Sequence, residues 1–329
     1  MRWIACSAVL FLAACNLDIG ETADTADPFD EAEHLARMAE VTEQLIQSSD
    51  PTQQAAGLLM ATTALNWGEH GIEPPLNEAE RLERLHALID TADTALARAL
   101  LAQLCASQGL QKECIRRGLD EAIVQFDDAD LIARLQLTYF LDRDRARQII
   151  VEAQTLNERH MDYALLILDA MEEHGGFVAE ELAVAPLIHA LSLSPPFQPV
   201  SDQCASPTPD DPELSQACER ILDLMVEGRS SMLLTSLGSA VSARRLEAQG
   251  DPDAQERHEQ WQARFYDQLA CFGSASDGIW ETADGQFVRQ CLEHWQEHGE
   301  ASALAMIAEK ARVDCGPVEP PPFRSALIN

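Results

Sequence analysis

The chain has few aromatic residues, few lysines and few positive charges overall. Of its 329 residues, 5% are aromatic and 23 are basic, against 55 acidic residues, which gives a formal net charge of −32. A surface this negative repels phosphate backbones, so nucleic acid is excluded as an expected partner. Neither of the two lysines, Lys112 and Lys310, has a glycine directly before it or a serine three positions earlier. This excludes a Gly-Lys-Ser/Thr phosphate loop and a Ser-x-x-Lys nucleophile pair.

Strand signals are also missing. No stretch alternates apolar and polar residues, and no Asn-Gly turn occurs. Apolar residues instead recur at helical spacing, most clearly in 38–46 and 214–225. Expected helix starts are marked by Asp50-Pro51, Asp211-Pro212, Asp251-Pro252 and Asn77 with Glu80. The sequence therefore predicts an all-α fold, either a helical-hairpin repeat or an irregular helical bundle, cross-linked by disulfides.

The middle of the chain shows a period of 34 to 35 residues. Asp93, Asp128 and Asp162 each stand three positions before a leucine, as a helix cap before its first buried residue would. The period resembles tetratricopeptide-type helical hairpins, which implies a solenoid with a surface for protein binding. The tryptophan, glycine–tyrosine and proline positions of that family are not recognisable here, so the irregular bundle stays open as an alternative.

Proline marks the expected domain boundaries. Residues 193–211 are rich in proline and cannot continue a helix, so they are interpreted as a linker or an ordered crossing. They separate a helical domain at 30–192 from a second helical block at 212–315. The proline-rich tail, 316–329, is expected to be extended or disordered.

The first fourteen residues have the pattern of an export signal. Arg2 precedes an apolar run of about a dozen residues, which is too short to cross a bilayer as a helix. The run ends in Leu12-Ala13-Ala14-Cys15, which resembles the lipobox of bacterial lipoproteins. That resemblance implies cleavage before Cys15 and a diacylglycerol on its thiol. The alternative is an ordinary signal peptide with a chance cysteine.

The residues after the lipobox bear on localisation. In the family, the residue after the cysteine guides sorting, and Asn16 here favours the outer membrane, facing the periplasm. The remainder of 15–29 is acidic and lacks helical periodicity, so it is expected to be a solvated tether.

Seven cysteines remain once Cys6 is cleaved off with the signal and Cys15 is acylated. An envelope location is oxidising, so disulfides are expected. The spacing favours sequential neighbours, namely Cys105–Cys114, Cys204–Cys218 and Cys271–Cys291, with Cys315 left over. No Cys-x-x-Cys pair occurs, which argues against metal thiolates.

One motif could carry metal chemistry. His294, Glu297 and His298 form a His-x-x-Glu-His sequence that resembles the inverted zincins. On a helix both histidines share a face and could bind Zn²⁺, while Glu297 could activate a water. The family's third ligand is a glutamate far downstream. The glutamates available here follow much more closely, at Glu300, Glu309 and Glu319. A structural reading, with both histidines bordering a buried stripe, is the alternative.

Other candidate residues have structural interpretations. Two Glu-x-x-His pairs, Glu31–His34 and Glu83–His86, match half of a di-iron site, but chance alone gives about one such pair in this composition. His258 falls on an apolar stripe with Trp261 and is expected in the core. No nucleophile elbow surrounds the serines at 230, 231 and 239, and no calcium-loop motif occurs.

These observations lead to one main functional hypothesis. We expect a lipid-anchored envelope protein whose helices bind another protein or a peptide, with no cofactor beyond the lipid on Cys15. The alternative is a zinc-dependent envelope hydrolase with His294 and His298 as ligands and Glu297 as its base. A structural lipoprotein without a discrete ligand is the third possibility.

Overall fold

The computed structural model describes residues 31–63, 75–126, 130–138, 143–191, 193, 197–226, 231–280 and 285–323. These residues form sixteen helices and no strand, which confirms the all-α prediction. The signal sequence, Cys15 and the tether lie outside the described residues, as do Asp128, Ser230 and the end of the tail. No helix of the described part of the chain is long and apolar enough to span a membrane.

The helices differ widely in length, from 6 residues in α6 to 27 in α15. In chain order they are α2 (Glu31–Gln47), α3 (Pro51–Thr63), α4 (Glu78–Thr91), α5 (Ala95–Ser107), α6 (Gln111–Arg116), α7 (Leu119–Phe126), α8 (Leu131–Thr138), α9 (Arg143–Glu152), α10 (His160–His174), α11 (Ala179–Leu191), α12 (Gln198–Cys204), α13 (Pro212–Val226), α14 (Met232–Ala248), α15 (Ala254–Trp280), α16 (Gly285–His298) and α17 (Glu300–Ala311).

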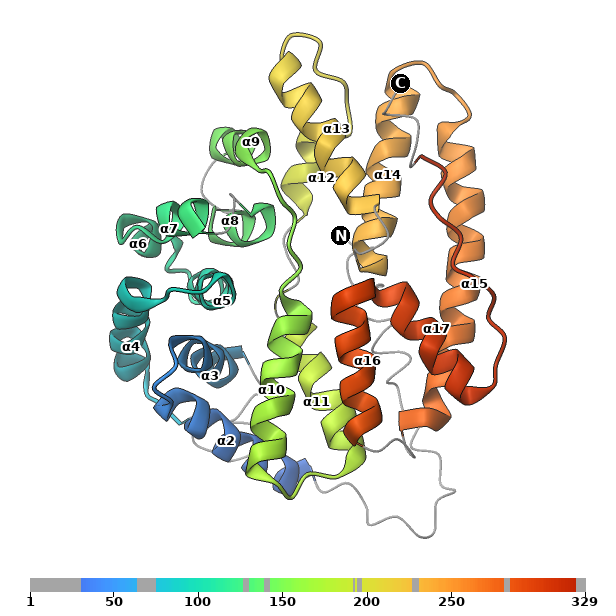
Figure 1. Ribbon diagram of the computed structural model, residues 1–329. Coiled ribbons are helices and arrows are strands. Elements are labelled where there is room, and N and C mark those ends of the chain that lie inside the picture. Colours follow the sequence, from blue (N-terminus) through green and yellow to red (C-terminus); the bar gives the residue numbers. More distant parts are fainter. Residues whose placement is uncertain are drawn as a thin grey trace.

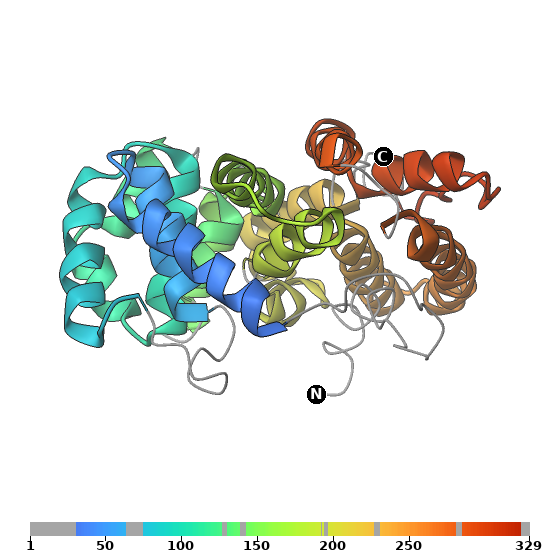
Figure 2. The ribbon, with the colours of Figure 1, turned by 90° about the horizontal axis from the view of Figure 1, so that it is seen from below.

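Helix packing follows a closed circuit. The order of contact is α2, α3, α5, α8, α9, α13, α14, α15, α17, α16 and α10, and α10 packs back onto α2. Figures 1 and 2 show α2–α9 on one side of the α10–α11 pair and α15–α17 on the other. The circuit joins helices far apart in sequence, so neither end of the described chain forms a separate unit.

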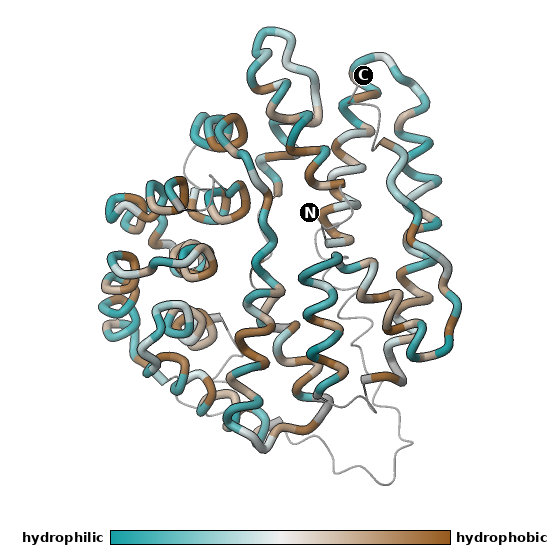
Figure 3. The backbone as a smooth tube through the Cα atoms, in the orientation of Figure 1, coloured by the Kyte–Doolittle hydropathy of each residue, from teal (hydrophilic) through white to brown (hydrophobic). Residues whose placement is uncertain are grey.

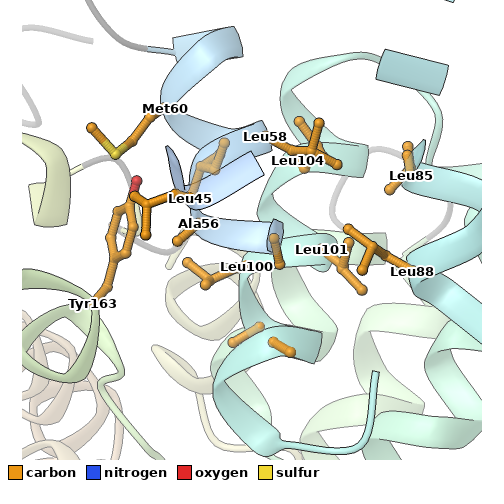
Figure 4. Packing of buried hydrophobic residues seen from close by; sticks show 14 of the residues in the cluster. Leu45, Ala56, Leu58, Met60, Leu85, Leu88, Leu100, Leu101, Leu104 and Tyr163 are labelled. Carbon is orange, nitrogen blue, oxygen red and sulfur yellow. The ribbon is translucent and has the colours of Figure 1, made fainter. Parts of the chain in front are cut away.

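Three large apolar clusters and a small fourth one, formed by Ala243, Ala254 and Phe323, make the core of the described residues. Residues of α2–α8 pack with α10 in the first cluster, where Leu45, Ala56 and Leu100 lie near Tyr163 (Figure 4). The second joins α10 and α11 to α15–α17, and the third joins α8 and α9 to α12–α14. Apolar and polar stretches alternate along the helices, as Figure 3 shows. The second and third clusters both cross the boundary that the sequence predicted at 193–211.

The proline-rich stretch at 193–211 is more structured than a linker. It contains α12, with Pro199 in its first turn, where a helix has no use for the missing N–H. Val200 and Cys204 are fully buried in the third cluster. A helix therefore forms at 198–204, within a stretch expected to be a linker or an ordered crossing, because Pro199 stands in the first turn of α12 and Pro207 and Pro209 follow its end.

The capping pattern behind the predicted repeat does not hold. Thr94, not Asp93, caps α5, with its hydroxyl oxygen 3.1 Å from the N–H of Ala97. Asp162 lies inside the first turn of α10, where it pairs with Arg159. The capping box at Asn77 and Glu80 is confirmed, with reciprocal bonds of 3.0 and 3.1 Å.

Two of the three predicted disulfides are confirmed, and the third is wrong. Cys105–Cys114 joins α5 to α6, and Cys204–Cys218 joins α12 to α13. Cys271 pairs with Cys315 instead of Cys291, because α15 packs against α17 and the chain after α17 returns along α15. Cys291 is a buried free thiol among the apolar residues of the second cluster. Burial raises its pKa to about 12.

Glycine fixes two helix crossings. Gly57 and Gly238 are each the seventh residue of the second helix in a hairpin, α3 and α14. A Cβ at Gly57 would lie 2.7 Å from the backbone nitrogen of Ile46 in α2, and one at Gly238 would lie 2.7 Å from Cβ of Met225 in α13. Each glycine therefore lets the last turn of the preceding helix approach closely.

We predict that Gly57→Ala and Gly238→Ala each destabilise the protein by about 1–3 kcal/mol, because the added methyl forces the paired helices apart. Gly285→Ala is the control, since its Cβ would meet only the movable end of Leu182 at 3.1 Å. Urea unfolding followed by circular dichroism measures the difference. Equal stability of all three variants would contradict the close-contact role.

We predict that Cys291 resists alkylation by iodoacetamide in the folded protein and reacts once the protein is unfolded without reductant. A buried thiol with a raised pKa supplies almost no thiolate at neutral pH. Peptide mapping by mass spectrometry under non-reducing conditions should also give a Cys271–Cys315 cross-linked peptide. A Cys271–Cys291 cross-linked peptide would contradict the Cys271–Cys315 pairing.

Candidate functional site

The zincin-like motif lies on α16. The rings of His294 and His298 are 4.5 Å apart, so the two side chains do come together. Nε2 of His294 is 2.8 Å from the hydroxyl of Ser302 in α17, and Nε2 of His298 is 3.5 Å from a carboxylate oxygen of Glu297. Within the described ranges, no three His, Cys, Asp or Glu side chains are grouped so that they could hold a metal ion. The motif thus supplies two neighbouring imidazoles, one of which is engaged by Ser302.

The two Glu-x-x-His pairs lie in different places. His86 of α4 is 2.9 Å from a carboxylate oxygen of Glu113 in α6. His34 of α2 is 2.9 Å from a carboxylate oxygen of Glu181 in α11. The side chain of Glu31 lies outside the described residues. Each histidine therefore has a carboxylate partner from another helix, and the structure does not bring the two pairs together.

Glu181 is a buried carboxylate held between α2 and α11. It accepts hydrogen bonds from His34 and Arg37 of α2 and, at 2.9 Å, from the backbone N–H of Val178. Burial raises the pKa of Glu181, but the donation from Val178, Arg37 and His34 outweighs it and leaves the pKa lowered. Because the carboxylate of Glu181 is buried and already accepts from three donors, this cluster ties two helices together rather than offering a reactive group.

The expected core position of His258 is confirmed, and its partner is one of the serines singled out in the sequence. Nδ1 of His258 is 3.0 Å from the hydroxyl of Ser239, and both residues are buried. Burial lowers the pKa of His258, which favours the neutral imidazole. The pair has the composition of a nucleophile and its base, but its burial keeps a substrate away from it. Ser231 instead caps α14, 3.2 Å from the N–H of Leu234.

Two carboxylates meet at the start of α14. Glu158, from the segment before α10, accepts the backbone N–H of Ser231 at 2.5 Å, and Glu300 of α17 accepts that of Met232 at 2.7 Å. Glu300 is buried, and burial together with the charge of Glu158 raises its pKa to about 7. His160 lies next to Glu158, at 3.9 Å. The arrangement joins three distant segments through two consecutive backbone donors.

The tail forms the most extensive contact that sequence reasoning did not predict. From Cys315 to Phe323 it runs along α15 without forming a helix (Figure 1). Cys315 is bonded to Cys271, and the amide of Gln268 then contacts the tail backbone twice. Its Nε2 donates to the carbonyl of Pro317 at 2.6 Å, and its Oε1 accepts from the N–H of Glu319 at 3.4 Å.

Further along the tail, Trp261 and Arg257 complete the contact. The indole N–H of Trp261 donates to the carbonyl of Glu319 at 3.0 Å. Phe323 is 2% exposed, packs with Ala243 and Ala254, and lies 5.6 Å under the guanidinium of Arg257. This face of α15 therefore holds an extended segment by side-chain bonds to its backbone and by one buried ring.

Two local signals of this face are present in the sequence. Trp261 falls on the apolar stripe with His258, and the composition of the tail predicts an extended or disordered segment. Neither signal indicates that the two meet, because the bond that brings the tail to α15 joins Cys271 to Cys315, the cysteine that spacing leaves over.

Comparisons with known proteins give no relative. No protein-family model, no curated protein and no solved structure matches the chain.

We predict that the contribution of Glu300 to stability falls as pH rises from about 4.5 to about 7, and that Glu300→Gln removes this pH-dependent loss. The carboxyl of Glu300 ionises near 4.5 when unfolded and near 7 when folded, so ionisation in this interval favours the unfolded state. The shift corresponds to about 3–4 kcal/mol, and glutamine can still accept the N–H of Met232.

Urea unfolding at pH 5 and pH 8 measures this effect, with Glu297→Gln, an exposed carboxyl of α16, as the matched control. Wild type and Glu300→Gln should differ more at pH 8 than at pH 5. The same difference at both pH values would contradict the raised pKa.

Proposed function

We propose that the protein is a cell-envelope lipoprotein, anchored through Cys15, whose helical surface binds a protein or a peptide. The observation that carries the binding role is the contact along α15, where Trp261 and Gln268 hold the backbone of an extended segment. A surface that already accommodates one extended segment has the chemistry to bind another.

The anchor is supported by the lipobox and by the cysteine chemistry of the folded chain. Six of the seven cysteines after Cys15 are paired in disulfides, as expected of a protein folded in an oxidising compartment. Acyl chains contribute ~0.8 kcal/mol per buried CH₂, so a diacylglycerol with a further chain holds a protein on a membrane nearly permanently. Asn16 favours the outer membrane, facing the periplasm.

The zinc-hydrolase alternative is not favoured by the geometry. Ser302 engages Nε2 of His294, the nitrogen that a helical His pair would turn to a shared metal. Glu297 lies beside His298 at the exposed end of α16. We therefore place the function on the α15 face rather than on this motif.

We predict that Cys15→Ala moves the protein from the membrane to the soluble fraction of its native host, because the thiol that carries the lipid is lost. Mass spectrometry of the wild-type protein should show an N-terminal peptide that begins at Cys15 and carries acyl chains. Cys291→Ala, which removes a free thiol inside the fold, is the control and should stay with the membrane.

Cross-linking in intact cells tests the binding role in the same strains. We expect the wild-type protein to give a defined adduct with one partner, because binding at a specific surface yields one product. A soluble wild-type protein with an unmodified Cys15 would overturn the anchor, and a monomer without adducts at every cross-linker length would overturn the binding role.

A further inference from the structure

The contact face of α15 is a regular stripe. Its members are Arg257, Trp261, Arg264, Gln268 and Cys271, and they recur at alternating steps of four and three residues. Such steps place side chains in one line along a helix. At ~1.5 Å per residue the stripe is about 21 Å long.

The tail has a matching period. Cys315, Val318 and Pro321 are its inward residues before Phe323, and they recur every three positions. The residues between them, among them Pro317, Glu319 and Pro320, are exposed. A three-residue repeat in a proline-rich segment is typical of an extended, polyproline-like chain, which here lies between Gly316, with a φ of 67°, and the turn at 322–323. The contacts from Cys271–Cys315 to Arg257–Phe323 show that the tail runs the length of the stripe.

The stripe recognises the tail mainly through its backbone. Trp261 and Gln268 bond carbonyls and an N–H that any extended segment would present. Two features add selectivity. Arg264 pairs with Glu319 at 2.7 Å, and Arg257 stacks on Phe323. Arg257 also pairs with Asp251 at 2.6 Å, so Arg264 is the arginine that favours an acidic residue in the bound segment.

We propose that this stripe is a binding site for proline-rich, extended segments of a partner protein, and that the tail, 316–323, is its resident intramolecular competitor. The preferred segment carries an acidic residue and, four positions later, an aromatic ring. The proposal rests on the proposed binding function and names its partner class.

The tail competes efficiently because it is tethered. The Cys271–Cys315 bond fixes its first residue at one end of the stripe, and such a short connection gives an effective concentration in the millimolar range. A partner segment must bind tightly enough to displace the tail at this effective concentration, so an intact tail excludes weak ligands from the stripe. The far end is held by one ring, that of Phe323. Loss of that ring should free most of the stripe while the disulfide stays intact.

The test is a fluorescence-anisotropy titration with a labelled peptide of the sequence Gly-Pro-Val-Glu-Pro-Pro-Pro-Phe. The proteins are the full chain, its Phe323→Ala variant and a variant that ends at Cys315. We expect both variants to bind the peptide at least about tenfold more tightly than wild type, because their own tail no longer competes. A peptide with alanine in place of its phenylalanine should bind more weakly.

A matched pair of substitutions in the Phe323→Ala background identifies the surface. Gln268→Met removes both backbone bonds and should weaken peptide binding about tenfold. Gln262→Met alters a half-buried glutamine of the same helix that contacts Tyr266 instead, and it should leave binding unchanged.

Three outcomes would overturn the proposal. The first is absence of peptide binding to both tail variants while circular dichroism shows native helix content. The second is equal weakening by Gln262→Met and Gln268→Met. The third is loss of native helix content in both tail variants, which would make the tail a part of the core. None of these results changes the membrane fractionation or the cross-linking, so failure of this proposal can be distinguished from failure of the proposed function.

Discussion

Helix α10 buries two faces in two different cores, and the rest of the fold depends on this arrangement. Tyr163, Ile167 and Met171 belong to the cluster formed with α2–α8, whereas Ala164 and Leu168 belong to the cluster with α15–α17. A helix that is apolar on both sides must be covered on both sides. The closed circuit of helices follows, because α10 can be covered only if distant parts of the chain meet on it.

The buried Arg245 holds specific segments together by directional hydrogen bonds, which apolar contacts do not provide. Arg245 of α14 bonds the carbonyl of Cys204, the hydroxyl of Ser215 and the carboxylate of Glu219. It thereby positions the chain that carries the Cys204–Cys218 bond. Because a guanidinium presents five donors in a rigid plane, it can serve several acceptors where a lysine could not. The scarcity of lysine in this sequence is consistent with this use of arginine.

Local patterns predicted the parts of the fold that depend on local physics. The stripe from Leu214 to Met225 is buried in α13 as its spacing indicated, and Asp211 caps that helix at 3.1 Å from the N–H of Leu214. Asp251-Pro252 also marked a helix start, but α15 begins two residues after Pro252, at Ala254. Helical spacing and caps act over three or four residues, so a single sequence displays them directly.

The parts that could not be predicted depend on which helices meet. The partner of Cys271 lies 44 residues away, and the nearer candidate, Cys291, was wrong because α16 turns its apolar face to α10 and α17. The α15 face escaped prediction for the same reason, since nothing near Trp261 in the sequence identifies Glu319 as its partner. Their contact exists only once α17 has returned the chain to α15. A site formed by one helix and a tail remote in sequence can therefore be recognised only from the three-dimensional structure.

The negative charge of the molecule and the proposed lipid anchor would act in opposite directions at a membrane surface. A net charge of −32 is repelled by anionic lipid headgroups, whereas acyl chains on Cys15 would hold the chain at the bilayer. With such an anchor, the acidic sequence between Cys15 and the folded part would keep that part away from the surface, since like charges extend a chain. On the α15 stripe, Arg257 is paired with Asp251 and Arg264 with Glu319 of the tail. Under the proposed binding role, a partner segment that displaces the tail would pair an acidic residue with Arg264, while anionic lipids are repelled by the protein as a whole.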